Sequence, residues 1–206
     1  NTATWIIAST VLILVLSELG FSVTALVASA GIIGAALGFG AQSVVKDVLN
    51  GLFMVFEDQL GVGDVVDLGM AEGVVERVGI RITEIRDVSG TLWFVRNGEI
   101  LRVGNHTQDW SRVILVLPVP YESNIDEMQN VLLESANSFA ASPEWRRKVV
   151  EDPEVWGIQS LSAEAITLRL VVKVRAGEQW AAERALYRAL KDSLDQRQVD
   201  IPPLNR

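Results

Sequence analysis

The longest apolar stretch of the chain runs from Gly20 to Val45 and contains no charged residue. A membrane-spanning helix needs about 20 apolar residues, so this stretch is long enough to cross a bilayer. Small residues recur along it at steps of three and four, which places them on one side of a helix and lets a neighbouring helix approach closely. These small residues are Ala28, Gly31, Gly34, Ala35, Ala36 and Gly38. Helices packed so closely around an axis can form the wall of a pore, and we expect this helix to line one.

A second apolar segment, residues 3–16, precedes the first. It is short for a full span, and because the chain begins at Asn1 rather than Met we expect the sequence to start within a longer protein. A signal peptide is the alternative, but neither a basic n-region nor a cleavage site is visible. We expect residues 17–22 to join two antiparallel spans. Only Glu18 is charged before Lys46, and most basic residues follow, which favours a cytoplasmic C-terminal side.

From Ser43 onward the long helix becomes amphipathic, with polar residues spaced among Val, Leu and Phe. Two interpretations are open: one long straight helix, or a bend at Gln42 and Ser43 after which the second half lies along the membrane surface. We favour the bend because glycines just before that point weaken the helix. We expect the charges of Lys46 and Asp47 to be solvated.

Beyond a glycine-containing turn at residues 58–64, the pattern alternates apolar and polar residues with a period of two, which predicts short strands. The expected strands are 65–68, 73–78, 80–87 and 91–96. Ser89-Gly90 and Asn97-Gly98 are dipeptides typical of hairpin turns. This region is therefore expected to form a small barrel-like β domain.

From Ser111 to the end, the pattern predicts a strand, a helix, two strands and a helix. The expected strands are 113–120, 155–161 and 165–174, and the expected helices run to about Phe139, capped by Asn124 or Asp126, and from Glu178 to Gln196. This order indicates a compact α+β unit of the ferredoxin-like kind, followed by an extended tail. The chain is thus expected to contain membrane and pore-lining helices at 1–57, a β domain at 58–108 and an α+β domain at 109–206.

Composition narrows the function. The net charge of −8 argues against a nucleic-acid-binding surface, which needs a basic patch. The chain has no cysteine and one histidine, His106, so it lacks the residues of thiolate or histidine-cluster metal sites. It contains no phosphate-binding loop, zinc-protease or nucleophile-elbow motif. We expect neither an enzyme nor a protein that holds a metal or another cofactor.

Several signatures then follow one another along the chain. They are G-I-I-G-A-A-L-G-F-G-A-Q at 31–42, N-G-L at 50–52, G-V-G-D-V-V-D-L at 61–68, E-G-V-V at 72–75, I-R-x-T-x-I-R at 80–86 and N-G at 97–98. In this order and at these distances they resemble the small-conductance mechanosensitive channel (MscS) family over nearly the whole chain. The E-D-Q-L-G-V-G-D stretch is most similar to the actinobacterial branch, which includes channels linked to amino-acid efflux.

The resemblance implies a homo-oligomer, seven-fold in the family, whose Gly/Ala helix lines the pore. It implies an Sm-like β domain and an α+β domain that together enclose a cytoplasmic vestibule, and it places the pore constriction at Phe39 and Ala35. Ala35 is too small to narrow a pore, so Phe39 is expected to form most of the constriction. Gln42 matches the residue before the family's bend, and Ser43 stands where the best-studied member has Gly. The family's C-terminal strand is expected to be missing, because the chain stops at Arg206.

We therefore predict a mechanosensitive ion channel of the bacterial inner membrane, which opens under tension on osmotic downshock. Its partners would be copies of itself, as a homoheptamer, membrane lipid, and the ions and small solutes that pass, with no nucleic acid. One alternative is a solute (amino-acid) efflux channel. Another, from a different class, is a membrane-anchored Sm-like RNA-binding module, which the acidic charge disfavours.

Overall fold

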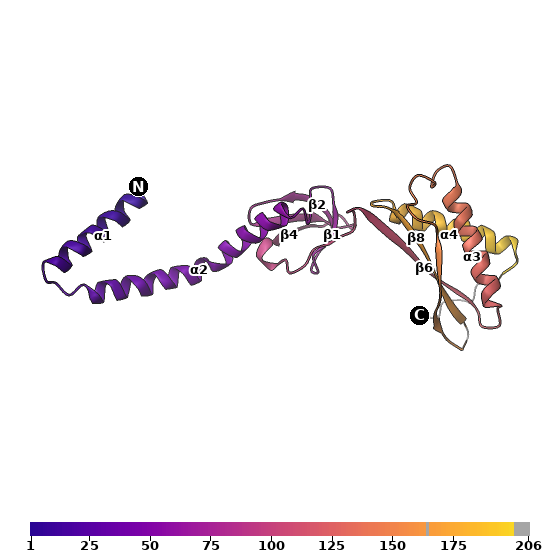
Figure 1. The fold of residues 1–206 in the computed structure, drawn as a ribbon, viewed down its shortest axis with the longest axis horizontal. Coiled ribbons are helices and arrows are strands. Elements are labelled where there is room, and N and C mark those ends of the chain that lie inside the picture. The colour runs from indigo at the N-terminus through magenta and orange to yellow at the C-terminus, as the bar shows by residue number, and fades with distance from the viewer. Residues whose placement is uncertain (164, 200–206) are drawn as a thin grey trace.

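The structure, a computed structural model, describes residues 1–163 and 165–199 of the chain. Its parts follow one another along one long axis: two helices at the N-terminal end, a β sheet in the middle and an α/β unit at the far end (Figure 1). The extended tail expected from residue 201 lies outside the described residues.

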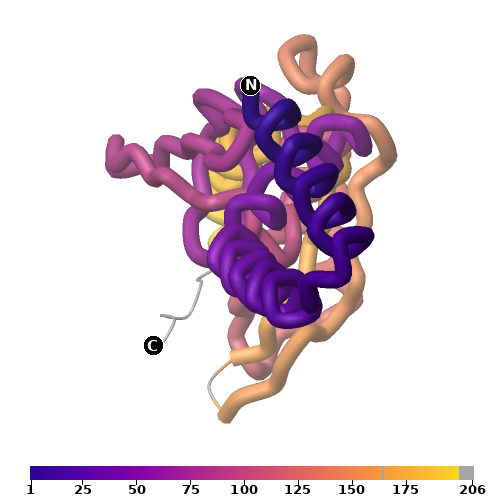
Figure 2. The backbone as a smooth tube through the Cα atoms, turned by 90° about the vertical axis from the view of Figure 1, so that its left-hand side faces the viewer, coloured from indigo at the N-terminus to yellow at the C-terminus, as the bar shows by residue number. Residues whose placement is uncertain are grey.

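Two exposed helices form the N-terminal part, α1 (Thr2–Glu18) and α2 (Thr24–Phe56). They diverge from the short turn that joins them (Figure 2), and α1 has no buried residue. Among the described helices, α2 is long and apolar enough to cross a membrane, whereas α1 is an apolar helix of 17 residues. The chain remains helical through Gln42 and Ser43, so any bend at these residues leaves α2 unbroken.

The middle part is an antiparallel sheet in the strand order β4-β3-β2-β1-β5. Its elements are β1 (Val65–Asp67), β2 (Glu72–Val78), β3 (Ile82–Arg86), β4 (Leu92–Arg96), the 3-10 helix η1 (Asn97–Glu99) and β5 (Gly104–Asn105). The four strands expected from the alternating pattern are all present. The turn expected at Ser89-Gly90 joins β3 to β4, and Gly90 there has a positive φ of 92°.

The core of this sheet is closed by the end of α2. Val66, Val75 and Ile85 are buried in one apolar cluster, and Met54 of α2 belongs to the same cluster. The last turns of the long helix are therefore packed as part of the β domain. The expectation of a hairpin turn at Asn97-Gly98 is wrong, because both residues are buried in η1.

The C-terminal unit has two layers, a sheet and a pair of helices. Its elements are β6 (Trp110–Pro120), α3 (Ile125–Ala141), β7 (Glu154–Leu161), β8 (Ala165–Arg175) and α4 (Gln179–Gln196). The sheet order is β6-β8-β7, and β6 pairs with β8 along its whole length. Both helices pack on one face of the sheet through a single apolar core, which leaves the other face of the sheet open (Figure 1). The predicted order of elements is confirmed, and Asn124 is the residue that caps α3.

Candidate pore helix and its coupling site

The first part of α2 is exposed throughout. Every residue from 24 to 46 is exposed, and the side chain of Phe39 is 78% accessible. Ala35, one turn before it, is exposed as well. Both side chains are therefore exposed, and the residues expected to form the constriction are available to face a pore.

The glycines of this helix have open space around them. A Cβ atom added at Gly31, Gly34 or Gly38 would meet no heavy atom within 4 Å outside the helix's own neighbouring backbone. Ala28 and Ala36 are exposed as well, so the surface of small residues is open within the described part of the chain. Gly residues exposed to solvent or lipid destabilise a helix by about 1 kcal/mol relative to Ala, so a set of them is explained by the close approach of another helix.

The second part of α2 is attached to the β domain by a buried carboxylate. Asp47 is 3% exposed, and its Oδ1 accepts a hydrogen bond of 3.0 Å from the backbone N–H of Gly98 in η1. The guanidinium of Arg81 lies 3.4 Å from its other oxygen. The expectation that Asp47 is solvated is therefore wrong. A buried carboxylate needs such donors, because burial without them costs several kcal/mol.

Asn97, next to this contact, is fully buried and ties η1 to the sheet. Its Oδ1 accepts a 2.8 Å hydrogen bond from the Thr83 hydroxyl, and its Nδ2 donates to the carbonyl oxygens of Gly79 and Ile80 at 3.0 and 3.2 Å. Its own carbonyl accepts from Nδ2 of Asn50 in α2, at 3.2 Å. The side chain of Asn97 thus holds β3 and the turn before it, and its backbone carbonyl holds α2.

Two glycines let α2 and η1 approach this closely. A Cβ at Gly51 would lie 2.2 Å from Nδ2 of Asn97 and 2.8 Å from the carbonyl oxygen of Ile80. A Cβ at Gly98 would clash with the carboxylate of Asp47 and would lie 3.3 Å from the backbone nitrogen of Asp47. We call Asp47, Gly51, Asn97 and Gly98 the coupling site, because together they fasten the second part of α2 to the β domain.

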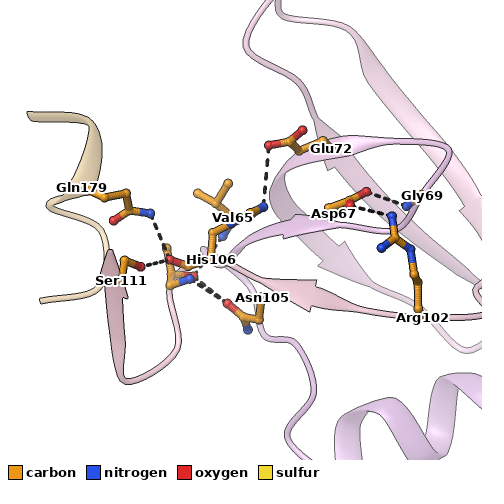
Figure 3. Close-up of polar contacts among 10 residues, drawn as sticks. Val65, Asp67, Gly69, Glu72, Arg102, Asn105, His106, Ser111 and Gln179 are labelled. Atoms are coloured by element: carbon orange, nitrogen blue, oxygen red, sulfur yellow. Dashed lines mark hydrogen bonds and ion pairs between the residues drawn. The ribbon is translucent and has the colours of Figure 1, made fainter. Parts of the chain in front are cut away.

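A second joint connects the β domain to the α/β unit at His106 (Figure 3). The backbone N–H of His106 donates to the Val65 carbonyl at 2.8 Å. Its carbonyl oxygen accepts from the Ser111 hydroxyl at 2.7 Å and from Nε2 of Gln179 at 3.0 Å, and both side chains point toward it in Figure 3. Its imidazole Nε2 lies 3.7 Å from a carboxylate oxygen of Glu72. The linker is therefore fastened to both of the units that it joins.

Within residues 1–163 and 165–199, no three His, Cys, Asp or Glu side chains lie together in a way that could hold a metal ion. The sequence predicted a solvated charge at Asp47 and a hairpin turn at Asn97, and it did not predict that either residue joins α2 to the β domain. The signal for them was the pair of dipeptides Asn50-Gly51 and Asn97-Gly98, which the structure brings into contact.

The three successive parts of the chain each match one part of the mechanosensitive ion channels. Residues 3–42 match the model for transmembrane helices 2/3, residues 43–108 the β-domain model and residues 113–201 the MscS C-terminal model. The chain belongs to the MscS family of mechanosensitive channels.

Two curated relatives illustrate the similarity. The small-conductance mechanosensitive channel of Caldanaerobacter subterraneus subsp. tengcongensis is 34% identical over 188 residues, which are 91% of this chain and 66% of the relative. The moderate conductance mechanosensitive channel YbiO of Escherichia coli is 30% identical over 202 residues, which are 98% of this chain and 27% of the relative. The chain thus spans less than two thirds of the length of these relatives.

Solved structures show the same fold. Helicobacter pylori MscS in its closed state superposes with a TM-score of 0.76 at 19% identity, covering 100% of this chain and 81% of that one. Arabidopsis thaliana MSL1 superposes with a TM-score of 0.72 at 18% identity, covering 98% of this chain and 74% of that one. The expected architecture of an N-terminal apolar helix, a β domain and an α+β domain is confirmed.

Proposed function

We propose that this protein is a mechanosensitive ion channel, a homo-oligomeric pore that membrane tension opens to release ions and small solutes on osmotic downshock. The observation that carries the proposal is the division of α2 into two halves. Residues 24–46 are exposed, whereas Asp47, Gly51 and Met54 are buried against the β domain. Such a helix presents one half for assembly in the membrane and anchors the other half in the soluble part.

The physical basis of gating is the area of the pore. Tension favours whichever state occupies more area in the membrane plane, so a state with a wider pore gains free energy when the membrane is stretched. A ring of Phe39 side chains, one from each copy, would close the narrow state by excluding water from an apolar constriction, without a physical plug. The surface of small residues would let neighbouring helices tilt and slide between two packings.

The coupling site would transmit this movement to the soluble domains. Asp47 and Gly51 hold the second half of α2 on η1, so a tilt of the helix must carry the β domain with it. The family resemblance supports seven copies and a cytoplasmic vestibule. From one stretch, residues 57–64, we infer that the protein belongs to the actinobacterial branch of the family.

We infer that the protein lies in the bacterial inner membrane with its β and α/β domains in the cytoplasm. The described residues before Lys46 carry a single charged side chain, Glu18, and the basic residues follow, as expected for a cytoplasmic C-terminal side. A reporter enzyme fused after Arg206 should be active only in the cytoplasm. Activity only outside the cytoplasm would contradict this orientation.

Patch-clamp recording of the purified protein in liposomes tests the proposal directly. We expect unitary currents that appear when suction is applied to the patch and disappear when it is released. Liposomes without protein provide the control for leak. Binding of single-stranded RNA without any stretch-activated current would instead support a membrane-anchored RNA-binding module.

A further inference from the structure

The open face of the C-terminal sheet carries two tryptophans interleaved with basic side chains. The guanidinium carbon of Arg112 lies 5.0 Å from the ring centre of Trp110 and 5.3 Å from that of Trp156. Nζ of Lys173 lies 4.3 Å from the Trp110 ring, and the guanidinium of Arg169 lies 6.0 Å from the Trp156 ring. We call these five residues the cation–Trp face.

This face is exposed in the single chain. Trp110 is 44% and Trp156 48% accessible, and Ile114, which follows on the same side of β6, is also exposed. No ion pair among residues 1–163 and 165–199 includes Arg112, and its guanidinium lies over the faces of the two rings. Trp and Arg are the residues most enriched at the energetic centre of protein interfaces, so the composition indicates a docking surface.

The opposite side of the same unit carries a groove between α3 and α4, with a volume of about 570 Å³. Glu134, Glu144 and Asp192 line it, and the small side chains of Ala185 and Ala189 leave room along its floor. Glu134 pairs with Arg197 at 2.7 Å, whereas no ion pair in the described part of the chain includes the other two acids. We call it the acidic groove.

We propose that the cation–Trp face of one copy docks into the acidic groove of the next copy. On the face, Lys173 pairs with Glu151 at 2.5 Å, whereas Arg112 and Arg169 belong to no ion pair among the described residues. These two cations and the two acids of the groove outside ion pairs carry opposite charge, which favours association of the two surfaces and disfavours either surface meeting itself. A tryptophan ring needs space that small floor residues provide. This inference rests on the proposed self-assembly of the channel and adds the surfaces that make the contact.

The placement of the two surfaces fits a ring. The helices cover one face of the sheet and the cation–Trp face is the other, so the surfaces lie on opposite sides of one unit. A contact between two different surfaces repeats from copy to copy and closes when the rotation between copies allows it. A contact of one surface with itself would stop at two copies.

Cysteine cross-linking tests the contact, because the chain has no cysteine of its own. Ile114→Cys lies on the face and Ser138→Cys lines the groove. In membranes of cells expressing the full chain, a short bifunctional thiol reagent should join the double variant into a ladder of dimers, trimers and larger species. Each single variant should remain monomeric on a denaturing gel. Ile114→Cys combined with Asn137→Cys is the matched control, because Asn137 is exposed but does not line the groove.

Charge exchange provides a second measurement on the same ladder. Arg112→Glu in the cysteine pair should lower the cross-linked yield by at least about tenfold, the effect of 1.4 kcal/mol. Reversing Glu144 and Asp192 to Arg in the same chain should restore it. Asp195→Arg, which changes an exposed acid of α4 outside the groove, should not.

Three results would overturn the inference. Dimers formed by a single-cysteine variant would show that a surface meets itself. A chain that gives stretch-activated current but no ladder would assemble through other surfaces, so the proposed function would stand and this contact would fail. Capture of an acidic peptide by the cation–Trp face, with no link between copies, would show that the partner is not a second copy.

Discussion

The side chain of Asp47 reaches the backbone of Gly98 across 51 residues of sequence, with Oδ1 accepting its N–H at 3.0 Å. The bond joins the second part of α2 to η1, the 3-10 helix that follows β4. Since both residues are buried, neither group has water as an alternative partner. The strength of this contact should therefore determine how firmly the helix is held by the β domain.

Asp47→Ala should lower the free energy of unfolding of the β domain by about 1–3 kcal/mol, because it leaves the buried Gly98 N–H without an acceptor. Amide hydrogen exchange at residues 97–99 should accelerate. Asp47→Asn retains an acceptor oxygen at the same place and should lose less. Equal losses in the two variants would attribute the effect to the charge near Arg81 instead of the hydrogen bond.

Gly51→Ala should destabilise the same contact by about 1–3 kcal/mol, the usual cost of overpacking. The added Cβ would lie 2.2 Å from Nδ2 of Asn97, so Asn97 would have to leave its position. Gly40→Ala is the control on the same helix, because its Cβ would meet nothing within 4 Å. Thermal unfolding measured on both variants should show a lower midpoint for Gly51→Ala only.

Gly34→Leu should hinder assembly or gating, because a large side chain would separate helices that the small residues bring together. Native mass spectrometry in detergent and patch-clamp recording measure the two effects. Ile32→Leu keeps the surface of small residues and serves as the control. Normal oligomers together with normal tension sensitivity in Gly34→Leu would contradict a pore wall made by this surface.

Phe39→Ser should lower the tension needed for opening and raise the resting leak, since a polar ring keeps water in the constriction. Patch-clamp thresholds of this variant and of the parent channel measure the effect. An unchanged threshold with unchanged leak would place the seal elsewhere, and Ile33→Ser and Leu37→Ser would then be the next variants to record.

Asp87 should contribute to stability at neutral pH and not in acid. Hydrogen bonds from the Ser89 hydroxyl and the Trp93 indole N–H, with backbone donors at residues 89 and 91, hold the pKa of its carboxyl well below the ordinary value. A carboxyl whose pKa is lower in the folded state stabilises the fold at pH values above its unfolded pKa of about 3.9. This stabilisation is lost as the pH falls below that value. The gap in melting temperature between the parent and Asp87→Asn should therefore narrow below about pH 4.

Much of the fold follows from the periodicity of the sequence. Alternation with a period of two located β2, β3 and β4, and helical spacing located α3 and α4, because each of these elements buries one face in a local core. The turn at Ser89-Gly90 follows from local conformational preference. Asn97-Gly98 has the same local preference, but its backbone packs under α2, and no local pattern shows a contact with residues about 50 positions earlier.

The candidate site was only partly accessible from sequence for the same reason. The spacing of Gly31, Gly34 and Gly38 predicts a close-packing surface directly, since this prediction depends on one helix. The burial of Asp47 depends on donors from Gly98 and Arg81, which the fold brings from elsewhere. A charged residue in an amphipathic helix is usually solvated. The burial of Asp47 is therefore visible only once the fold has brought Gly98 and Arg81 next to it.

The boundary between the membrane part and the soluble part falls inside a helix. Met54 completes the apolar cluster around Val66 and Ile85, so an exchange of pore helices between related proteins has a natural junction before Asp47 and an unfavourable one after Phe56. A graft joined after Phe56 would bring foreign side chains into the core of the sheet. It would also remove the Asp47 carboxylate that accepts the N–H of Gly98 in η1. Grafts joined among residues 43–46 would keep the β domain intact and transfer the exposed half alone, so different apolar helices could be compared on one unchanged β domain.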